Sequence, residues 1–78
     1  MTRSAFTRKY VRFRRLLTDA RRARGLTQVE LARKLGRPQS FISKVEQGER
    51  RLDVIEFLEV ARALRVDPER LLAEVERR

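Results

Sequence analysis

Residues 25–48, with the sequence GLTQVELARKLGRPQSFISKVEQG, decide the fold. Glycine is the residue that most easily adopts the left-handed conformation at the end of a helix, and proline is tolerated only in a first helical turn. Gly36 and Gly48 therefore mark helix ends, and Pro38 marks a helix start. The stretch predicts two short helices, from Thr27 to Gly36 and from Pro38 to Gly48, joined by a tight turn.

Both helices show the start signals and the apolar spacing of an amphipathic helix. Thr27 and Glu30 form a capping-box pattern, in which the hydroxyl and the carboxylate each bond the other residue's backbone amide. The small side chain of Ala32 lets the two helices approach and cross steeply. The predicted inward side chains are Leu31, Ala32 and Leu35 in the first helix, and Ile42 and Val45 in the second.

The outward side of the second helix carries polar side chains of the kind that bind base edges. A projection at about 100° per residue centres Ile42 and Val45 on the buried side. A major groove admits one helix and rewards groups that donate to or accept from base edges. An ordinary solvent-exposed surface is the alternative, but an idle surface in so charged a chain would carry mainly Glu and Lys. The side chains predicted to face outward are Gln39, Ser40, Ser43, Lys44 and Gln47.

Three further helices follow from the same signals. A first helix ends at Gly25, a fourth begins at Asp53 and a fifth begins at Asp67. No alternating strand pattern occurs, so we expect a compact all-α domain of five helices over residues 7–78, preceded by a flexible basic arm, residues 1–6. The apolar residues predicted to face inward are Tyr10, Phe13, Leu17 and Ala20 in the first helix, Val54, Phe57, Leu58, Ala61 and Leu64 in the fourth, and Leu71, Leu72 and Val75 in the fifth.

The charge of the chain indicates a polyanionic partner. The 78 residues carry a formal net charge of +9, and the excess is at the N-terminal end. Nine Arg and Lys residues stand against one acid in residues 1–25, five against three in residues 26–50, and six against seven in residues 51–78. The longest apolar run covers residues 71–73, too short for a membrane span. We expect a cytoplasmic, nucleoid-associated protein.

The composition also argues against catalysis and bound cofactors. The chain has no His and no Cys, which removes the commonest general base and the commonest metal ligands. No glycine-rich phosphate loop occurs. The sequence therefore predicts a binding protein with no catalytic residue, no metal and no cofactor. The carboxylates that capping accounts for are Glu30, Asp53, Glu56 and Asp67.

Two motifs in the chain closely resemble the lambda-repressor/Cro-like (XRE) helix-turn-helix family. The resemblance extends from about Phe13 to Leu72, with the helix-turn-helix unit at about residues 28–47, and it implies five helices around one core with the third helix in the major groove of DNA. The motifs are Gly25-Leu26-Thr27-Gln28-x-Glu30-Leu31-Ala32-x-x-Leu35-Gly36 and Gln39-Ser40-x-Ile42-Ser43-Lys44-x-Glu46-x-Gly48.

The resemblance also implies the residues that contact DNA. Gln28 stands at the N-terminus of the second helix, where the helix dipole favours a phosphate. The implied base contacts are Gln39, Ser40 and Lys44, and the implied phosphate contacts are Gln28, Ser43, Arg50 and Arg51.

Other positions bear on stability more than on recognition. The resemblance implies a partly buried ion pair between Arg21 and Glu46. Pro38 departs from the Ser or Thr cap that is usual in the family, and Leu52 replaces a common Pro and is predicted to be core. Phe41 lies about 70° from the centre of the buried side, so it either flanks the core or touches a thymine methyl group or sugar.

The fifth helix raises the question of a partner. Leu71, Leu72 and Val75 either pack locally against the first helix or form a two-fold homodimer interface, which this family commonly builds from its C-terminal part. The leading hypothesis is a sequence-specific regulator of transcription, a repressor that occupies an operator on double-stranded DNA. One alternative is an antitoxin-like or other protein-interaction module that also binds its own operator. Another is RNA binding, although no cluster of exposed aromatic residues is expected.

Overall fold

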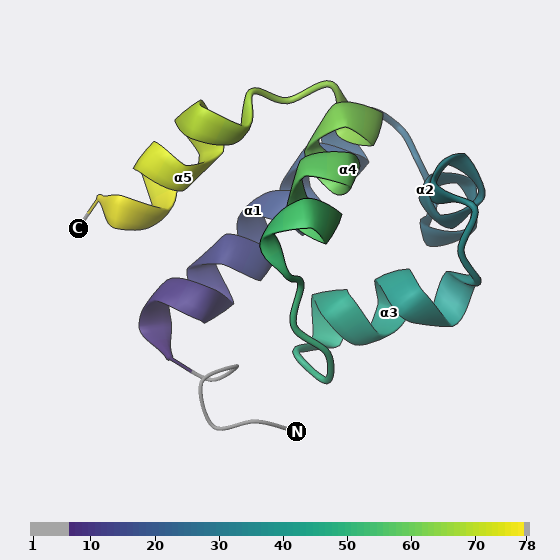
Figure 1. Ribbon diagram of the computed structural model, residues 1–78, viewed down its shortest axis with the longest axis horizontal. Coiled ribbons are helices and arrows are strands. Elements are labelled where there is room, and N and C mark those ends of the chain that lie inside the picture. The colour runs from purple at the N-terminus through teal and green to yellow at the C-terminus, as the bar shows by residue number, and fades with distance from the viewer. Residues whose placement is uncertain (1–6, 78) are drawn as a thin grey trace.

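The computed structural model describes residues 7–77, which form five α-helices and no strand (Figure 1). The prediction of an all-α fold with five helices is therefore confirmed. The arm predicted for residues 1–6 lies outside the described residues. None of the helices in the described part is long and apolar enough to cross a membrane. The helices are α1 (Arg8–Ala23), α2 (Gln28–Leu35), α3 (Gln39–Gln47), α4 (Val54–Leu64) and α5 (Pro68–Glu76).

The ends of α2 and α3 follow local rules of helix capping. Thr27 and Glu30 form the capping box at the start of α2, and hydrogen bonds from Thr27 hold the pKa of Glu30 below its usual value. Gly36 and Gly48 end the two helices with φ angles of 68° and 82°, in the left-handed region that favours glycine. Pro38 is the N-cap of α3 rather than its first helical residue, and it makes no side-chain capping bond.

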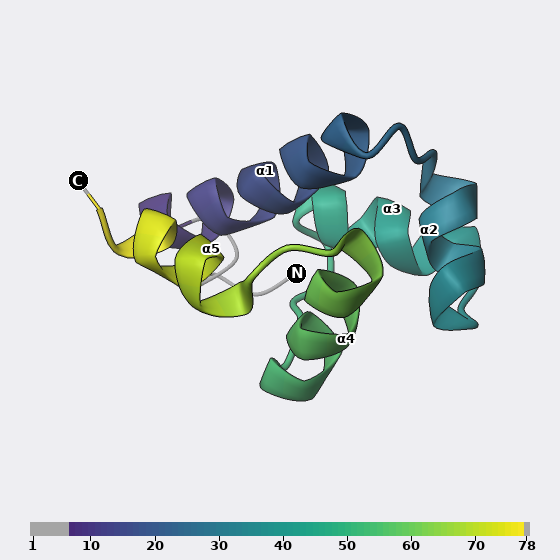
Figure 2. The same cartoon turned by 90° about the horizontal axis from the view of Figure 1, so that it is seen from above.

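The apolar core lies between α1, α2, α3 and α4, and α5 packs along the N-terminal part of α1 (Figures 1 and 2). Each helix contributes its inward side at the spacing of an amphipathic helix. Burying these side chains is the main favourable term in the stability of so small a domain. The buried apolar side chains are Phe13, Leu17, Leu31, Ala32, Phe41, Ile42, Val45, Phe57, Val60, Ala61, Leu64 and Leu71.

α4 differs from its predicted packing. The sequence predicts Val54 and Leu58 inside, but their exposed fractions are 72% and 43%. Val60, which the prediction omits, is buried. The first turn of α4 extends beyond the neighbouring helices (Figure 2), so Val54 and the adjacent Ile55 stay in solvent. The buried side of α4 consists of Phe57, Val60, Ala61 and Leu64.

Phe41 belongs to the core, which supports one of the two interpretations open in the sequence. Its exposed fraction is 7%. The Cζ atoms of Arg37 and Arg50 lie 4.3 Å and 4.8 Å from the centre of the ring, so the two guanidinium groups cover its outer side. Leu52 packs against the same core and is half-buried.

Glu56, in the first turn of α4, fixes both loops that flank α3. Its carboxylate accepts two hydrogen bonds from Arg50, each 2.9 Å, and one from Arg37 at 3.3 Å. The side chain of Glu56 is 12% exposed. The hydrogen bonds from Arg50 lower the pKa of Glu56 to about 2, with smaller contributions from the Asp53 amide and the charge of Arg37.

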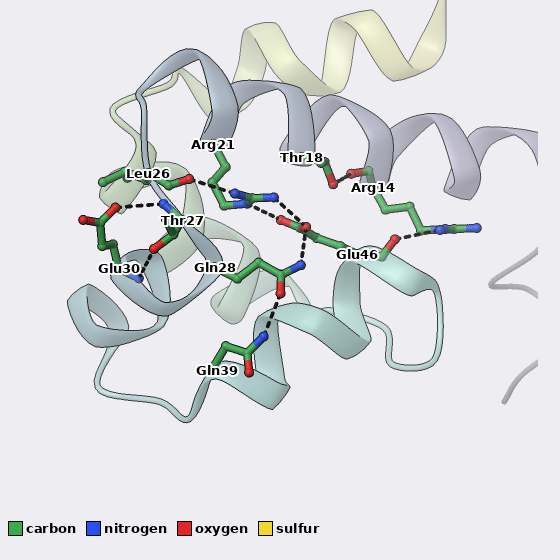
Figure 3. Close-up of polar contacts among 9 residues, drawn as sticks. All are labelled: Arg14, Thr18, Arg21, Leu26, Thr27, Gln28, Glu30, Gln39 and Glu46. Atoms are coloured by element: carbon green, nitrogen blue, oxygen red, sulfur yellow. Dashed lines mark hydrogen bonds and ion pairs between the residues drawn. The ribbon is translucent and has the colours of Figure 1, made fainter.

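An ion pair joins α1 to α3 at the edge of the core (Figure 3). Arg21 donates from Nε to Glu46 Oε2 at 2.6 Å and from Nη2 to Glu46 Oε1 at 3.0 Å. Its remaining nitrogen, Nη1, donates to the Leu26 carbonyl oxygen at 2.7 Å. The two charged side chains are only 9% and 10% exposed, so each depends on the other for compensation.

Replacing Arg21 should destabilise the fold. Arg21→Ala leaves the carboxylate of Glu46 buried without its cation, which we expect to lower the free energy of unfolding by about 3–5 kcal/mol. The control is Arg22→Ala, because Arg22 is the exposed neighbour on the same helix and its loss should change stability by less than about 0.5 kcal/mol. Urea denaturation of both variants measures the difference, and equal stabilities would contradict a structural role for the pair.

The stability that Glu56 contributes should depend on pH. Because its pKa falls from 4.5 to about 2 on folding, the contribution is fully present above pH 4.5 and is lost as the pH falls toward 2. We expect wild type to be more stable than Glu56→Gln at pH 7, and the gap to narrow progressively below pH 4.5. Chemical denaturation at a series of pH values measures the gap. A gap that is constant from pH 7 to pH 3 would contradict this account.

Candidate nucleic-acid interface

The outward side of α3 is polar and accessible, as the helical projection requires. Gln39, Ser40, Lys44 and Gln47 are exposed, and Ser43 is half-buried. The opposite side is buried in the core through Phe41, Ile42 and Val45. The three residues predicted as base contacts, Gln39, Ser40 and Lys44, therefore share one accessible surface that begins at the N-terminus of α3.

A chain of hydrogen bonds connects the start of α3 to the buried ion pair (Figure 3). Gln39 Nε2 donates to Gln28 Oε1 at 2.8 Å, and Gln28 Nε2 donates to Glu46 Oε1 at 2.9 Å. Glu46 is in turn held by Arg21. The bond to Gln28 uses one of the two amide protons of Gln39 and so fixes the orientation of the amide. The second amide proton is left for another acceptor.

Gln28 occupies the position predicted for a phosphate contact, but the protein already uses its side chain. It is the first residue of α2 and is half-buried. Its oxygen accepts from Gln39 and one of its amide protons goes to Glu46, so a single amide proton remains for an external group. The geometry gives Gln28 a positioning role toward Gln39, in addition to the phosphate role predicted from the sequence.

The two arginines predicted to contact phosphates, Arg50 and Arg51, both have contacts within the protein. Arg50 is half-buried and paired with Glu56, and their hydrogen bonds raise the pKa of Arg50. Arg51 is exposed, and its Cζ atom lies 5.0 Å from the centre of the Tyr10 ring. Arg50 therefore offers less net charge to a phosphate than its position suggests.

Arg37 is a cation that the sequence interpretation missed. It lies in the loop between α2 and α3, one residue before the N-cap of the helix with the polar outward side. Its guanidinium group is shared between the Phe41 ring and Glu56. The sequence feature that could have identified it is its place directly before Pro38. A cation there lies close to any anion that approaches the N-terminal end of α3.

The fifth helix divides its three apolar residues between inside and outside. Leu71 is 8% exposed and lies in the core, as local packing requires, so it is not accessible to a partner. Leu72 is 46% exposed and Val75 is half-buried. These two residues line an open groove of about 320 Å³ together with Tyr10 and Phe13.

The larger exposed apolar surface is on α4, where the sequence interpretation did not place it. Val54 and Ile55, at the start of the helix, are 72% and 64% exposed, and Leu58 one turn later is 43% exposed. We call these three residues the α4 patch. Among residues 7–77, no cluster of Asp and Glu side chains is placed to hold a metal ion.

Comparisons with known proteins agree with this geometry. The family model described as helix-turn-helix matches residues 17–71. The solved structure of an XRE-family like protein from Pseudomonas syringae pv. tomato is 54% identical over 87% of this chain and 83% of its own, with a TM-score of 0.83.

A second solved structure is that of the restriction-modification controller protein C.AhdI from Aeromonas hydrophila, which is 36% identical over 78% of this chain and 92% of its own, with a TM-score of 0.72. The comparison with curated protein sequences gives no match. Because the family model spans well over half of the sequence and places α2 and α3 at its centre, the chain belongs to the XRE-type helix-turn-helix family of DNA-binding domains.

Proposed function

We propose that this protein is a sequence-specific regulator of transcription that represses by occupying an operator on double-stranded DNA. The observation that carries the proposal is the accessible polar side of α3, whose first residue, Gln39, is held in a fixed orientation by Gln28. Preorganised side chains on a helix that fits one major groove are what direct recognition of base pairs needs. The description of C.AhdI as a controller protein supports a regulatory role.

The chemistry of two side chains suggests which bases they prefer. An amide can bind adenine with two hydrogen bonds, donating to N7 and accepting from the N6 amino group. Gln39 has an oxygen and its second amide proton for this purpose. Lys44, an exposed cation, matches the two acceptors on the edge of guanine. Ser40, between them on the same surface, accepts or donates through its hydroxyl group.

Phosphate contacts would fix the protein on the duplex without selecting the sequence. We assign this role to Gln28, Ser43, Arg50 and Arg51, and we add Arg37 on its position before α3. A net charge of +9 favours association with any duplex, and recognition of bases then selects the site. We assign no catalytic step and no cofactor to this surface, and the DNA partner places the protein with the nucleoid in the cytoplasm.

We propose that the protein binds DNA as a homodimer in which a second copy covers the α4 patch. Exposed apolar side chains grouped on one surface indicate an interaction site. In such a dimer the two α3 helices have to lie about 34 Å apart to reach half-sites one turn apart on DNA.

Selection of bound sites from a library of random duplexes tests the function directly. We expect one enriched, palindromic site for wild type. Gln39→Ala and Lys44→Ala should each weaken binding to that site by about 1–3 kcal/mol and relax the preference at one position per half-site. Since both residues are exposed, the melting temperatures of the two variants should stay near that of wild type. A library that returns no enriched sequence would overturn the proposal.

The homodimer proposal predicts a difference between two matched substitutions of exposed apolar residues. Ile55→Glu places a charge in the α4 patch and should give a monomer with about a hundredfold weaker binding to the selected duplex, because the two half-sites are then bound independently. Leu72→Glu places the same charge on α5 and should leave the dimer intact. Sedimentation velocity at micromolar concentration distinguishes them. A dimer disrupted by Leu72→Glu, and not by Ile55→Glu, would move the interface to α5.

A further inference from the structure

We propose that Arg14 is a positioning residue for DNA recognition, which sets the angle of α3 by holding its C-terminal end against α1. The recognition part of this inference depends on the function proposed above. Arg14 lies outside residues 17–71, the segment that matches the family model. The role is therefore assigned from the contacts of Arg14 in this structure.

The first contact is a hydrogen bond to the backbone of α3 (Figure 3). Arg14 Nη1 donates to the carbonyl oxygen of Glu46 at 2.7 Å. Arg21, two helical turns further along α1, holds the carboxylate of the same residue. The two arginines are about 10 Å apart along the helix axis. Arg14 thus binds the backbone of Glu46 and Arg21 binds its side chain. These two contacts restrict rotation and tilting of α3 against α1.

The second contact involves Gly48, the residue that ends α3. A Cβ atom at Gly48 would lie 3.0 Å from both Cζ and Nε of Arg14. Gly36 ends α2 with a similar left-handed φ, but a Cβ atom there would meet nothing within 4 Å. Gly48 therefore serves two purposes, because it adopts the left-handed conformation and it also leaves room for the guanidinium group. Gly36 serves the first purpose alone.

The electrostatics of the contact favour the same arrangement. The C-terminal end of a helix attracts a cation, because its last carbonyl groups carry partial negative charge. Arg14 Nε is buried and has no hydrogen-bond acceptor among the described residues. Its guanidinium group is thus held by the bond to the Glu46 carbonyl and by packing against Gly48, so a change at either point should release it.

The position of this contact explains why it would matter for recognition. The bond between Gln28 and Gln39 holds the N-terminal end of α3, and Arg14 holds the C-terminal end. Recognition side chains work only when they are held within about 0.5 Å and 10–20° of the productive geometry. Without Arg14, the C-terminal end can shift, and Lys44, which is closer to that end than Gln39, should be displaced most.

The first test compares two variants that remove the same charge from neighbouring positions of α1. Arg14→Met removes the contact with α3, whereas Arg15→Met removes an exposed arginine and controls for the lost positive charge. Affinity is measured for the duplex selected by wild type and for a scrambled duplex, at a temperature where all the variants are folded. We expect Arg15→Met to weaken both complexes equally.

Arg15→Met should leave the ratio of the affinity for the selected duplex to that for the scrambled duplex unchanged, and Arg14→Met should lower this ratio about tenfold. A tenfold loss is within the usual cost of one mismatched base pair. The loss should concentrate at the base pair recognised by Lys44. Arg14→Lys, which keeps one donor for the Glu46 carbonyl, should recover part of the ratio. Equal ratios for Arg14→Met and Arg15→Met would overturn the positioning role.

The second test needs no DNA, so it separates failure of this inference from failure of the proposed function. Gly48→Ala and Gly36→Ala are each made in wild type and in Arg14→Met. In wild type, Gly48→Ala should raise the unfolding equilibrium constant about tenfold more than Gly36→Ala, because it also displaces Arg14 from the Glu46 carbonyl. In Arg14→Met the two glycine substitutions should have equal effects. A difference that persists without Arg14 would overturn the proposed contact.

Discussion

Glu46 places a carboxylate where its side chain is only 10% exposed, and a charge in such a site must be compensated by neighbouring groups. Arg21 supplies two hydrogen bonds and Gln28 a third. Since Gln28 also holds Gln39, the group that ties α1 to α3 also orients the first side chain on the outer surface of α3. The ion pair that stabilises the fold and the side chain proposed to read DNA therefore belong to one polar network.

The fold was predictable from the sequence because its signals are local. Both ends of α2 and α3 and the starts of α4 and α5 carry a capping box, a glycine or a proline, and each of these acts over a few residues. Phe57, Ala61 and Leu64 were predicted inside from helical spacing and are buried. Val54 is exposed because the neighbouring helices do not reach the first turn of α4, and periodicity carries no information about the length of overlap. Leu58 lies beside the buried Phe57, but about 100° from it around the helix and away from the buried side.

The residues of the candidate site could be predicted from the sequence, but the contacts between them could not. The exposed side of α3 follows from counting positions around a helix, so Gln39, Ser40 and Lys44 appear where projection puts them. The partners of Gln28 do not follow, because residues from α2 and α3 meet only after the helices cross. The same holds for Arg37, whose guanidinium group packs on Phe41 through a contact between a loop and a helix.

The carboxylate of Glu56 changes what the arginines near α3 can contribute to DNA binding. The salt dependence of DNA binding reports how many condensed counterions the duplex releases. Each basic side chain that has no carboxylate partner and reaches a phosphate releases about one of them. An arginine already neutralised inside the protein displaces little, because a phosphate has to compete with the carboxylate for it. Arg50, and Arg37 in part, are in that position. Under the proposed function, the number of arginines beside α3 thus exceeds the number of ions exchanged there, and affinity at high salt should rest more on contacts with bases.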